Sequence, residues 1–316
     1  MSDISTNERV TVIGSGLMGP GIACRAALAG HEVTLVDKDL TRLEKGKEKA
    51  FEYISDLVAG EIATAEQGEA ARKLITGGES IEAACKNADL VIEAITENIA
   101  AKQSLFRDID NWTNPDCLIA SNTSGLSITE IGAEVTHKDR IATAHFWFPA
   151  HLVPLVEIVM SDKTTLQTAE SMKRIFASWG KAPVIVKKDL PGQLANRILQ
   201  AVIREALYIV ESGLASAEDV DTAIKYGPGL RFPVWGPLEH IDAVGLDLAL
   251  SVQDGVLPNL CNEVKAPRIL RQLVDEGLKG YSTKQGVYDW SKKDMKALAA
   301  NRDAFIMEML KRNSGN

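Results

Sequence analysis

The chain has 316 residues, of which 35 are basic and 43 are acidic, and its net charge is −8. A hydrophobic content of 45% suits a globular core and excludes a mainly disordered chain, and the acidic balance excludes a basic nucleic-acid surface. No apolar run is long enough for a membrane helix, and the polar start MSDISTNERV does not resemble a secretory signal. The four cysteines have no metal-site or redox-pair spacing. We therefore expect a cytoplasmic protein without a metal.

The first part of the chain alternates between short β-branched runs and helical segments. Helices are expected at residues 18–29 and, as one or two amphipathic segments, over 41–73. Strands are expected at residues 10–13, 32–36, 90–95, 118–121, 141–145, 155–159 and 184–186. This alternation predicts an α/β fold with a doubly wound parallel sheet.

The pattern changes after Pro191-Gly192, where helical periodicity replaces the strand signals. Residues 193–210 are nearly apolar on all sides, which is typical of a helix buried in a domain or at a subunit contact. We therefore predict two domains, an α/β domain over residues 1–189 and an all-helical domain over 190–316.

A glycine-rich turn joins the first strand to the first helix with the pattern G-x-G-x-x-G. Gly14 is expected to make the tight turn, Gly16 to let the backbone approach a pyrophosphate, and Gly19 to let the helix pack against the strand. The backbone of Leu17 and Met18 faces the same phosphates at the helix N-terminus. The turn predicts dinucleotide binding.

Asp37 ends the second predicted strand, where a carboxylate can accept hydrogen bonds from both ribose hydroxyls. The same carboxylate would repel a 2′-phosphate, so the predicted cofactor is NAD, and NADP is disfavoured. Lys38 and Arg42 lie close by and weaken that preference. The alternative is an ordinary α/β turn with an Asp that caps a strand.

A histidine and a glutamate interrupt two neighbouring apolar runs. His145 ends one predicted strand, on the edge of the sheet where ligands bind. Glu157 lies inside the next run, and a buried carboxylate needs a partner. A His–Glu pair meets that need and prepares the imidazole as a general base, although a structural histidine is the alternative. Residues 121–124 add hydroxyl and amide groups, which are also typical of a helix cap with an Asx turn.

Several longer motifs resemble the 3-hydroxyacyl-CoA dehydrogenase family over nearly the whole chain. The matching segments are residues 14–23, 91–102, 121–128, 145–159, 190–199, 235–247 and 280–290. The resemblance implies a Rossmann-type domain, a helical dimerisation domain and a homodimer. It also implies that His145 takes the hydroxyl proton while hydride passes to the nicotinamide, and that Glu157 orients His145. Ser124 and Asn196 match residues that position the reacting oxygen or the ring, and the cofactor site is matched at Glu97, Lys102 and Asn122.

Departures from the acyl-CoA pattern concern the substrate pocket. Phe148 stands where acyl-CoA members usually have Asn, and Ser282 where they commonly have Lys. Trp147 and Phe148 in the histidine segment, with Trp235 in the second domain, are therefore predicted to line the pocket. Burial in the core is the alternative for these aromatic residues.

Other features resemble family members that act on small free acids, namely the gulonate, carnitine and pyridine-carboxylate dehydrogenases. These features are Pro154 and the turn at 227–231. Arg204 and Arg231 could hold a carboxylate through bidentate hydrogen bonds, or could pair with structural acids. The first hypothesis is an NAD-dependent dehydrogenase of a small free 3-hydroxy acid. The alternatives are a short-chain 3-hydroxyacyl-CoA dehydrogenase, which needs cations over 41–73 for the CoA phosphates, and a non-catalytic, crystallin-like protein that binds NAD.

Overall fold

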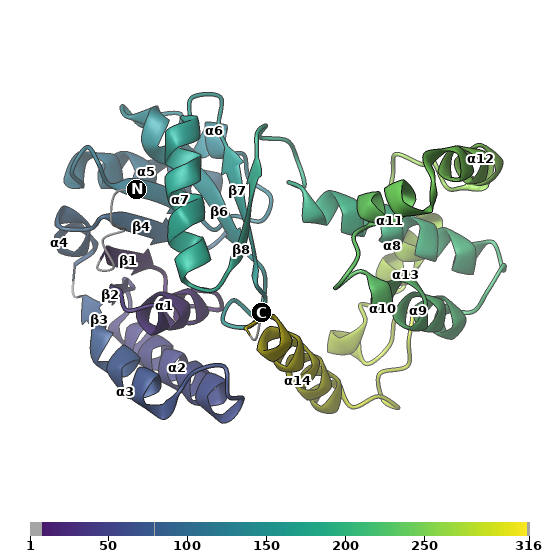
Figure 1. Ribbon diagram of the computed structural model, residues 1–316, viewed down its shortest axis with the longest axis horizontal. Coiled ribbons are helices and arrows are strands. Elements are labelled where there is room, and N and C mark those ends of the chain that lie inside the picture. The colour runs from purple at the N-terminus through teal and green to yellow at the C-terminus, as the bar shows by residue number, and fades with distance from the viewer. Residues whose placement is uncertain (1–7, 79, 315–316) are drawn as a thin grey trace. The chain divides into compact units, whose positions relative to one another are not determined.

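The computed structural model describes residues 8–78 and 80–314, so most of the polar N-terminal segment discussed above lies outside the described ranges. The chain divides into two compact units, shown in Figure 1. The first unit contains Met1–Leu194 and Ala300–Asn316, and the second contains Ala195–Ala299. This division differs from the predicted 1–189 and 190–316, because the end of the last helix joins the first unit.

The first unit is built on one eight-stranded sheet in the order β3-β2-β1-β4-β5-β6-β7-β8. The strands from β3 to β6 in this order are parallel, as predicted, and β7 is antiparallel to β6. The final strand β8 is parallel to β7. The bounds are β1 Arg9–Ile13, β2 Glu32–Val36, β3 Ile75–Gly78, β4 Leu90–Glu93, β5 Leu118–Ser121, β6 Ile141–Phe146, β7 Leu155–Met160 and β8 Ala182–Val186.

Two details of the sheet differ from the sequence prediction. A fully parallel sheet was expected, but residues 147–154 between β6 and β7 are too few for a crossover, which needs about a dozen residues. The edge strand β3 was missed because its sequence, Ile-Thr-Gly-Gly, lacks the apolar run of a buried strand. Because the connection is short, the successive strands β6 and β7 are direct neighbours in the sheet.

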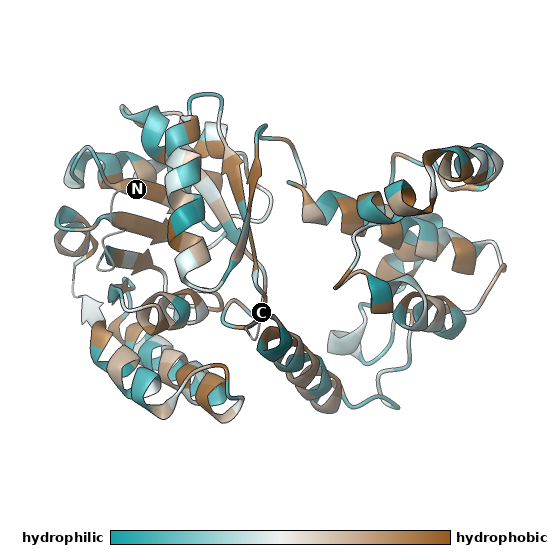
Figure 2. Cartoon of the chain, in the orientation of Figure 1, coloured by the Kyte–Doolittle hydropathy of each residue, from teal (hydrophilic) through white to brown (hydrophobic). Residues whose placement is uncertain are grey.

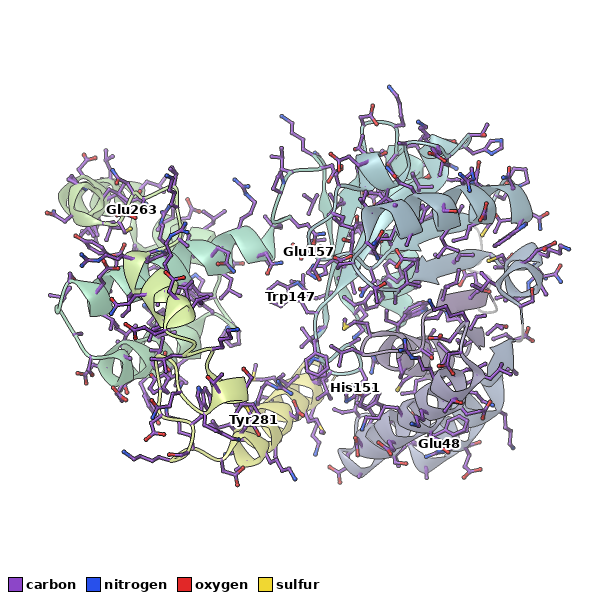
Figure 3. All side chains as sticks on the ribbon, turned by 180° about the vertical axis from the view of Figure 1, so that it is seen from behind. Glu48, Trp147, His151, Glu157, Glu263 and Tyr281 are labelled. Atoms are coloured by element: carbon purple, nitrogen blue, oxygen red, sulfur yellow. The ribbon has the colours of Figure 1, made fainter. Side chains whose placement is uncertain are left out.

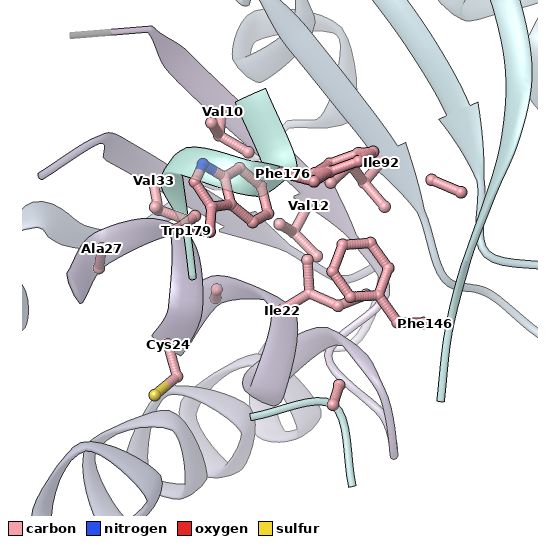
Figure 4. Close-up of a cluster of buried hydrophobic side chains, with 14 of the residues drawn as sticks. Val10, Val12, Ile22, Cys24, Ala27, Val33, Ile92, Phe146, Phe176 and Trp179 are labelled. Carbon is pink, nitrogen blue, oxygen red and sulfur yellow. The ribbon is translucent and has the colours of Figure 1, made fainter. Parts of the chain in front are cut away.

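Helices cover both faces of the sheet, and alternate residues of each strand point to opposite faces. Val12 belongs to the cluster packed against α1, α2, α3 and α7, and the next residue, Ile13, belongs to the cluster packed against α4, α5 and α6. Figure 4 shows part of the first cluster, and Figure 2 shows the apolar colour along the strands. The bounds are α1 Gly19–Leu28, α2 Leu40–Ala59, α3 Ala65–Leu74, α4 Ile81–Lys86, α5 Ile99–Trp112, α6 Ile128–Ile131 and α7 Leu166–Ser178.

The second unit is helical, as predicted, and all of its residues are described. Its helices are α8 Ala195–Glu211, α9 Ala217–Tyr226, α10 Pro228–Arg231, α11 Pro237–Val244, α12 Leu246–Val256 and α13 Arg268–Asp275. The last helix, α14 Met295–Ser314, begins in this unit and ends in the first.

Two kinds of feature are absent from residues 8–78 and 80–314. No helix in these ranges is long and apolar enough to cross a membrane. No three histidine, cysteine or acidic side chains gather there as a group that could hold a metal. The cytoplasmic location stays a prediction.

Candidate active site

His145 and Glu157 lie directly opposite each other on β6 and β7. The imidazole Nδ1 is 2.8 Å from Glu157 Oε2. Glu157 is fully buried, and His145 is 5% exposed. A buried carboxylate is stable only where hydrogen bonds replace its lost water. The hydrogen bond from His145 is one of these, as the sequence predicts.

Further donors hold the Glu157 carboxylate in place. The Trp147 indole N–H donates to Oε2 at 2.9 Å, and the Leu194 backbone N–H donates to Oε1 at 2.9 Å. Figure 3 labels Trp147 and Glu157. An ionised carboxylate only accepts, so a hydrogen bond to ionised Glu157 requires the proton on His145 Nδ1, and in that neutral tautomer Nε2 carries the lone pair. Trp147, which the sequence predicts as a pocket residue, thus donates to the same carboxylate oxygen that pairs with His145.

The other ring nitrogen of His145 faces the turn that follows β5. His145 Nε2 is 3.2 Å from Ser124 Oγ. Asn122 Oδ1 accepts a hydrogen bond of 2.9 Å from the Phe146 N–H, which ties this turn to the histidine strand. The structure thus brings together Ser124, His145 and Glu157, three of the four residues predicted to be catalytic.

Glu97 holds the same turn from the other side. Its Oε1 accepts from Thr123 Oγ1 at 2.7 Å and from the Ser124 N–H at 2.8 Å. Burial alone would raise the pKa of Glu97, but these hydrogen bonds and the Lys102 ammonium lower it below its ordinary value. Glu97 is therefore ionised at neutral pH, and it fixes the Ser124 backbone.

Lys102 lies between two carboxylates and is 1% exposed. Its ammonium is 2.6 Å from Glu93 Oε1 and 3.3 Å from Glu97 Oε2. Glu93 is fully buried, and its Oε2 accepts from Ser121 Oγ at 2.6 Å. Sequence reasoning missed Glu93, although a carboxylate that ends the apolar strand β4 is the same signal that identified Glu157.

We expect Lys102→Met to destabilise the protein by about 3–5 kcal/mol, because it leaves the buried Glu93 carboxylate without its ion pair. Urea unfolding followed by circular dichroism measures the change. The matched control is Glu93→Gln combined with Lys102→Met, which removes both charges and should recover much of the loss. A double variant no more stable than Lys102→Met would contradict this account of the pair.

The glycine turn has the shape that a dinucleotide pyrophosphate needs. Gly14 has φ +105°, and a Cβ there would lie 2.6 Å from the Ala94 carbonyl oxygen. A Cβ on Gly19 would lie 1.9 Å from the Gly14 oxygen, whereas one on Gly16 would meet nothing within 4 Å. Gly14 and Gly19 thus shape the turn, and Gly16 leaves its outer surface open to a ligand.

A cavity of about 340 Å³ lies beyond the ends of β1 and β4, where the strand order reverses. Gly14, Gly16 and Asp37 line it together with the apolar side chains of Ile95 and Leu105. Open α/β sheets bind ligands at this switch point. An acidic group for ribose, the open surface at Gly16 for phosphate and an apolar wall together fit NAD. Of the other residues predicted to face the phosphates, Leu17 is 68% exposed and Met18 precedes α1.

Asp37 is held in place by Ser15, which sequence reasoning did not single out. The backbone N–H and the Oγ of Ser15 each donate to Asp37 Oδ2 at 2.9 Å. Burial would raise the pKa of Asp37, but hydrogen bonds from Ser15 and from the Asp39 backbone lower it. The carboxylate is therefore ionised and fixed in the cavity.

We expect Asp37→Ala to weaken NAD binding about tenfold and to strengthen NADP binding. The substitution removes an acceptor for the ribose hydroxyls and the repulsion of a 2′-phosphate, while Lys38 and Arg42 line the same cavity. Calorimetric titration of both dinucleotides measures the change, with the exposed Glu44→Gln on α2 as control. Unchanged NADP affinity would contradict this role of Asp37.

Phe148, in the first unit, is 47% exposed, and the other predicted residues lie in the second unit; the roles of all of them stay predictions. Asn196 is near the start of α8, and Arg204 Nη1 donates to the Glu263 carbonyl at 3.3 Å. Arg231 ends α10 and is exposed. Trp235 packs edge-on against His240, with ring centroids 5.1 Å apart.

Comparisons with known proteins agree on one family. Residues 9–190 match its model described as 3-hydroxyacyl-CoA dehydrogenase, NAD binding domain, and residues 192–290 match the corresponding C-terminal domain. A 5-formyl-3-hydroxy-2-methylpyridine 4-carboxylate 5-dehydrogenase of Mesorhizobium japonicum is 33% identical, over 93% of this chain and 94% of that protein. The human mitochondrial hydroxyacyl-coenzyme A dehydrogenase is 38% identical, over 90% and 91%.

A solved structure is similar to this chain in fold as well as in sequence. The crystal structure of a 5-formyl-3-hydroxy-2-methylpyridine 4-carboxylic acid 5-dehydrogenase, described as an NAD⁺-dependent dismutase, has a TM-score of 0.89. It is 32% identical and covers 98% of this chain and 99% of its own. The similarity therefore includes both units of the chain.

Proposed function

Because the chain belongs to the 3-hydroxyacyl-CoA dehydrogenase family and is an NAD-dependent oxidoreductase acting on a CH–OH group, we propose that it oxidises a small 3-hydroxy acid with a free carboxylate. The main support for this reaction is the hydrogen bond of 2.8 Å between His145 Nδ1 and Glu157 Oε2. This bond leaves Nε2 available beside Ser124, close to the edge of the sheet that carries the glycine turn.

His145 acts as the general base in this proposal. Its Nε2 accepts the proton of the substrate hydroxyl, and the positive charge that develops on the ring is stabilised by Glu157. The Ser124 hydroxyl, 3.2 Å from Nε2, holds the substrate oxygen at the position from which the proton leaves. NAD, when bound, supplies the acceptor for the hydride that leaves the carbon bearing this hydroxyl. Trp147 and the Leu194 N–H donate to the buried Glu157 carboxylate, which offsets part of the cost of burying a charge there.

Support for a free acid comes from the pyridine-carboxylate relative and from the sequence departures at Phe148 and Pro154. The second candidate is a 3-hydroxyacyl-CoA substrate, which the 38% identity with the human hydroxyacyl-coenzyme A dehydrogenase favours. A non-catalytic role is disfavoured because a structural protein has no need of the oriented His145–Glu157 pair.

Steady-state kinetics with NAD tests the proposal. The substrates are 3-hydroxybutyryl-CoA and a panel of free acids that contains 3-hydroxybutyrate, L-gulonate, carnitine and 5-hydroxymethyl-pyridine carboxylates. We expect at least one acid to give a kcat/KM that is tenfold or more above that of the thioester. Turnover of the thioester alone would overturn the free-acid substrate and favour the second candidate.

We infer that a second copy of the chain covers the helical unit, giving the homodimer that the family resemblance implies. Helices α8 to α13, all described, contain no buried residue. On α12 the side chains of Leu246, Leu248 and Leu250 are 59%, 54% and 62% exposed. Apolar surface of this extent is typical of an obligate interface.

We expect Leu250→Glu to convert the dimer into monomers, because it places a charge in an apolar contact. Light scattering after size-exclusion chromatography measures the mass. Asp254→Asn on the same helix is the control and should remain dimeric. A monomeric wild-type protein would contradict the inference.

A further inference from the structure

The C-terminal helix α14 lies beyond the segments that match the family, which end at residue 290. Its residues from Ala300 onward belong to the first unit. Ile306 and Met307 pack against the larger core cluster, and a Cβ on Gly60 would lie only 2.6 Å from Met307 Sδ. The Lys311 ammonium adds an ion pair of 2.8 Å with Glu61. These contacts fix the helix against the C-terminal end of α2.

The anchored helix places one arginine close to the histidine segment. Arg302 lies one turn before Ile306, on the same helix face. Its guanidinium carbon is 5.6 Å from the centroid of the Phe148 ring, which is within cation–π range. Phe148 follows Trp147, whose indole holds the catalytic carboxylate Glu157. Arg302 therefore lies at the outer end of the segment that carries the general base.

Both members of this contact are accessible to a small molecule. The Phe148 residue is 47% exposed, and the Arg302 side chain is 44% exposed. Asp303 accepts from Arg302 Nε at 2.8 Å and lies 2.7 Å from Nη2. The described polar contacts of Arg302 run from Nε and Nη2, both to Asp303. One edge of the guanidinium is thus held by Asp303, and the other can bind a ligand.

Apart from Asp303, the surroundings of Arg302 include His151 and the cations around it. His151 lies next to α14 in Figure 3, and burial together with the Lys181 ammonium lowers the pKa of His151 to about 3. His151 is therefore neutral at physiological pH. Lys49, which also faces His151, pairs with Glu52 at 2.5 Å. Among the described residues, Asp303 is the one carboxylate with a described contact to Arg302.

We propose that Arg302 binds the carboxylate of the acid substrate, so that the C-terminal helix supplies a specificity residue to the active site. The inference rests on the proposed function, because a thioester has no such charge. A guanidinium held on one edge and stacked on an aromatic ring is oriented for a carboxylate. Arg302 would then share the task that the sequence predicts for Arg204 and Arg231, whose roles stay predictions.

The test compares Arg302→Met, Arg302→Lys and the control Arg312→Met, which removes an exposed charge from the same helix. The substrates are 3-hydroxybutyrate, L-gulonate and carnitine, with methyl 3-hydroxybutyrate as the neutral counterpart. We expect Arg302→Met to raise KM for the acids about tenfold or more, in keeping with the loss of a charge-assisted hydrogen bond, and to change KM for the ester less than about twofold. Arg302→Lys should lie between, and the control should match the wild type.

Thermal unfolding and the Kd for NAD show whether the variants fold and bind cofactor normally. If the wild type oxidises an acid, and Arg302→Met alters acid and ester equally or leaves the acid unchanged, Arg302 is not the carboxylate ligand and the proposed function stands. If the wild type oxidises only the thioester, the proposed function and this inference are both wrong. If Arg302→Met fails to fold, the ratio of acid to ester in Arg302→Lys decides in the same way.

Discussion

Replacing His145 by glutamine is expected to lower kcat by about 10²–10⁴-fold, the contribution typical of a general base. Glutamine is close in size and can still donate to Glu157, but it has no basic nitrogen at the position of Nε2. The Kd for NAD should stay within about twofold, because His145 is not among the residues that line the cofactor cavity. Steady-state kinetics and calorimetric titration of NAD measure the two quantities.

Two further variants separate the base from its neighbours. Ser124→Ala removes the hydroxyl near Nε2 and should cost about tenfold in kcat, as expected for one hydrogen bond. Glu157→Gln keeps the shape of the pair but removes the charge that stabilises the protonated ring, so its loss should exceed that of Ser124→Ala. Unchanged turnover in His145→Gln would remove His145 as the base.

Much of the α/β unit could be predicted because its signals are local. Each strand from β4 to β8 carries an apolar run, and the glycine turn specifies its own backbone shape. The pairing of His145 with Glu157 was also predictable, since each interrupts an apolar run and a buried carboxylate needs a partner. The antiparallel direction of β7 could also be predicted, because the connection at 147–154 is too short for a parallel crossover.

Other features depend on contacts between distant parts of the chain. Lys102 matched a cofactor-site position, yet its burial depends on Glu93 and Glu97. No local pattern indicates that Ser15 holds Asp37, because a serine in a glycine turn fits many environments. The return of α14 to the first unit is also non-local, and so the contact between Arg302 and Phe148 was not predicted.

Gly19→Ala is expected to abolish measurable NAD binding, a loss of at least about 100-fold in Kd. The new Cβ would lie 1.9 Å from the Gly14 carbonyl oxygen, so the glycine turn and the start of α1 must move apart. The displaced backbone N–H groups then no longer converge on the pyrophosphate. Calorimetric titration with NAD measures the loss, and urea unfolding should show a destabilisation of about 1–3 kcal/mol.

Gly16→Ala is the informative control, because a Cβ at this position meets nothing within 4 Å. Its stability should match that of the wild type, while its methyl group occupies the surface that the pyrophosphate approaches, so NAD affinity should still fall. The pair therefore distinguishes a steric requirement inside the fold at Gly19 from one toward the ligand at Gly16. Wild-type NAD affinity in both variants would mean that this turn does not bind the dinucleotide.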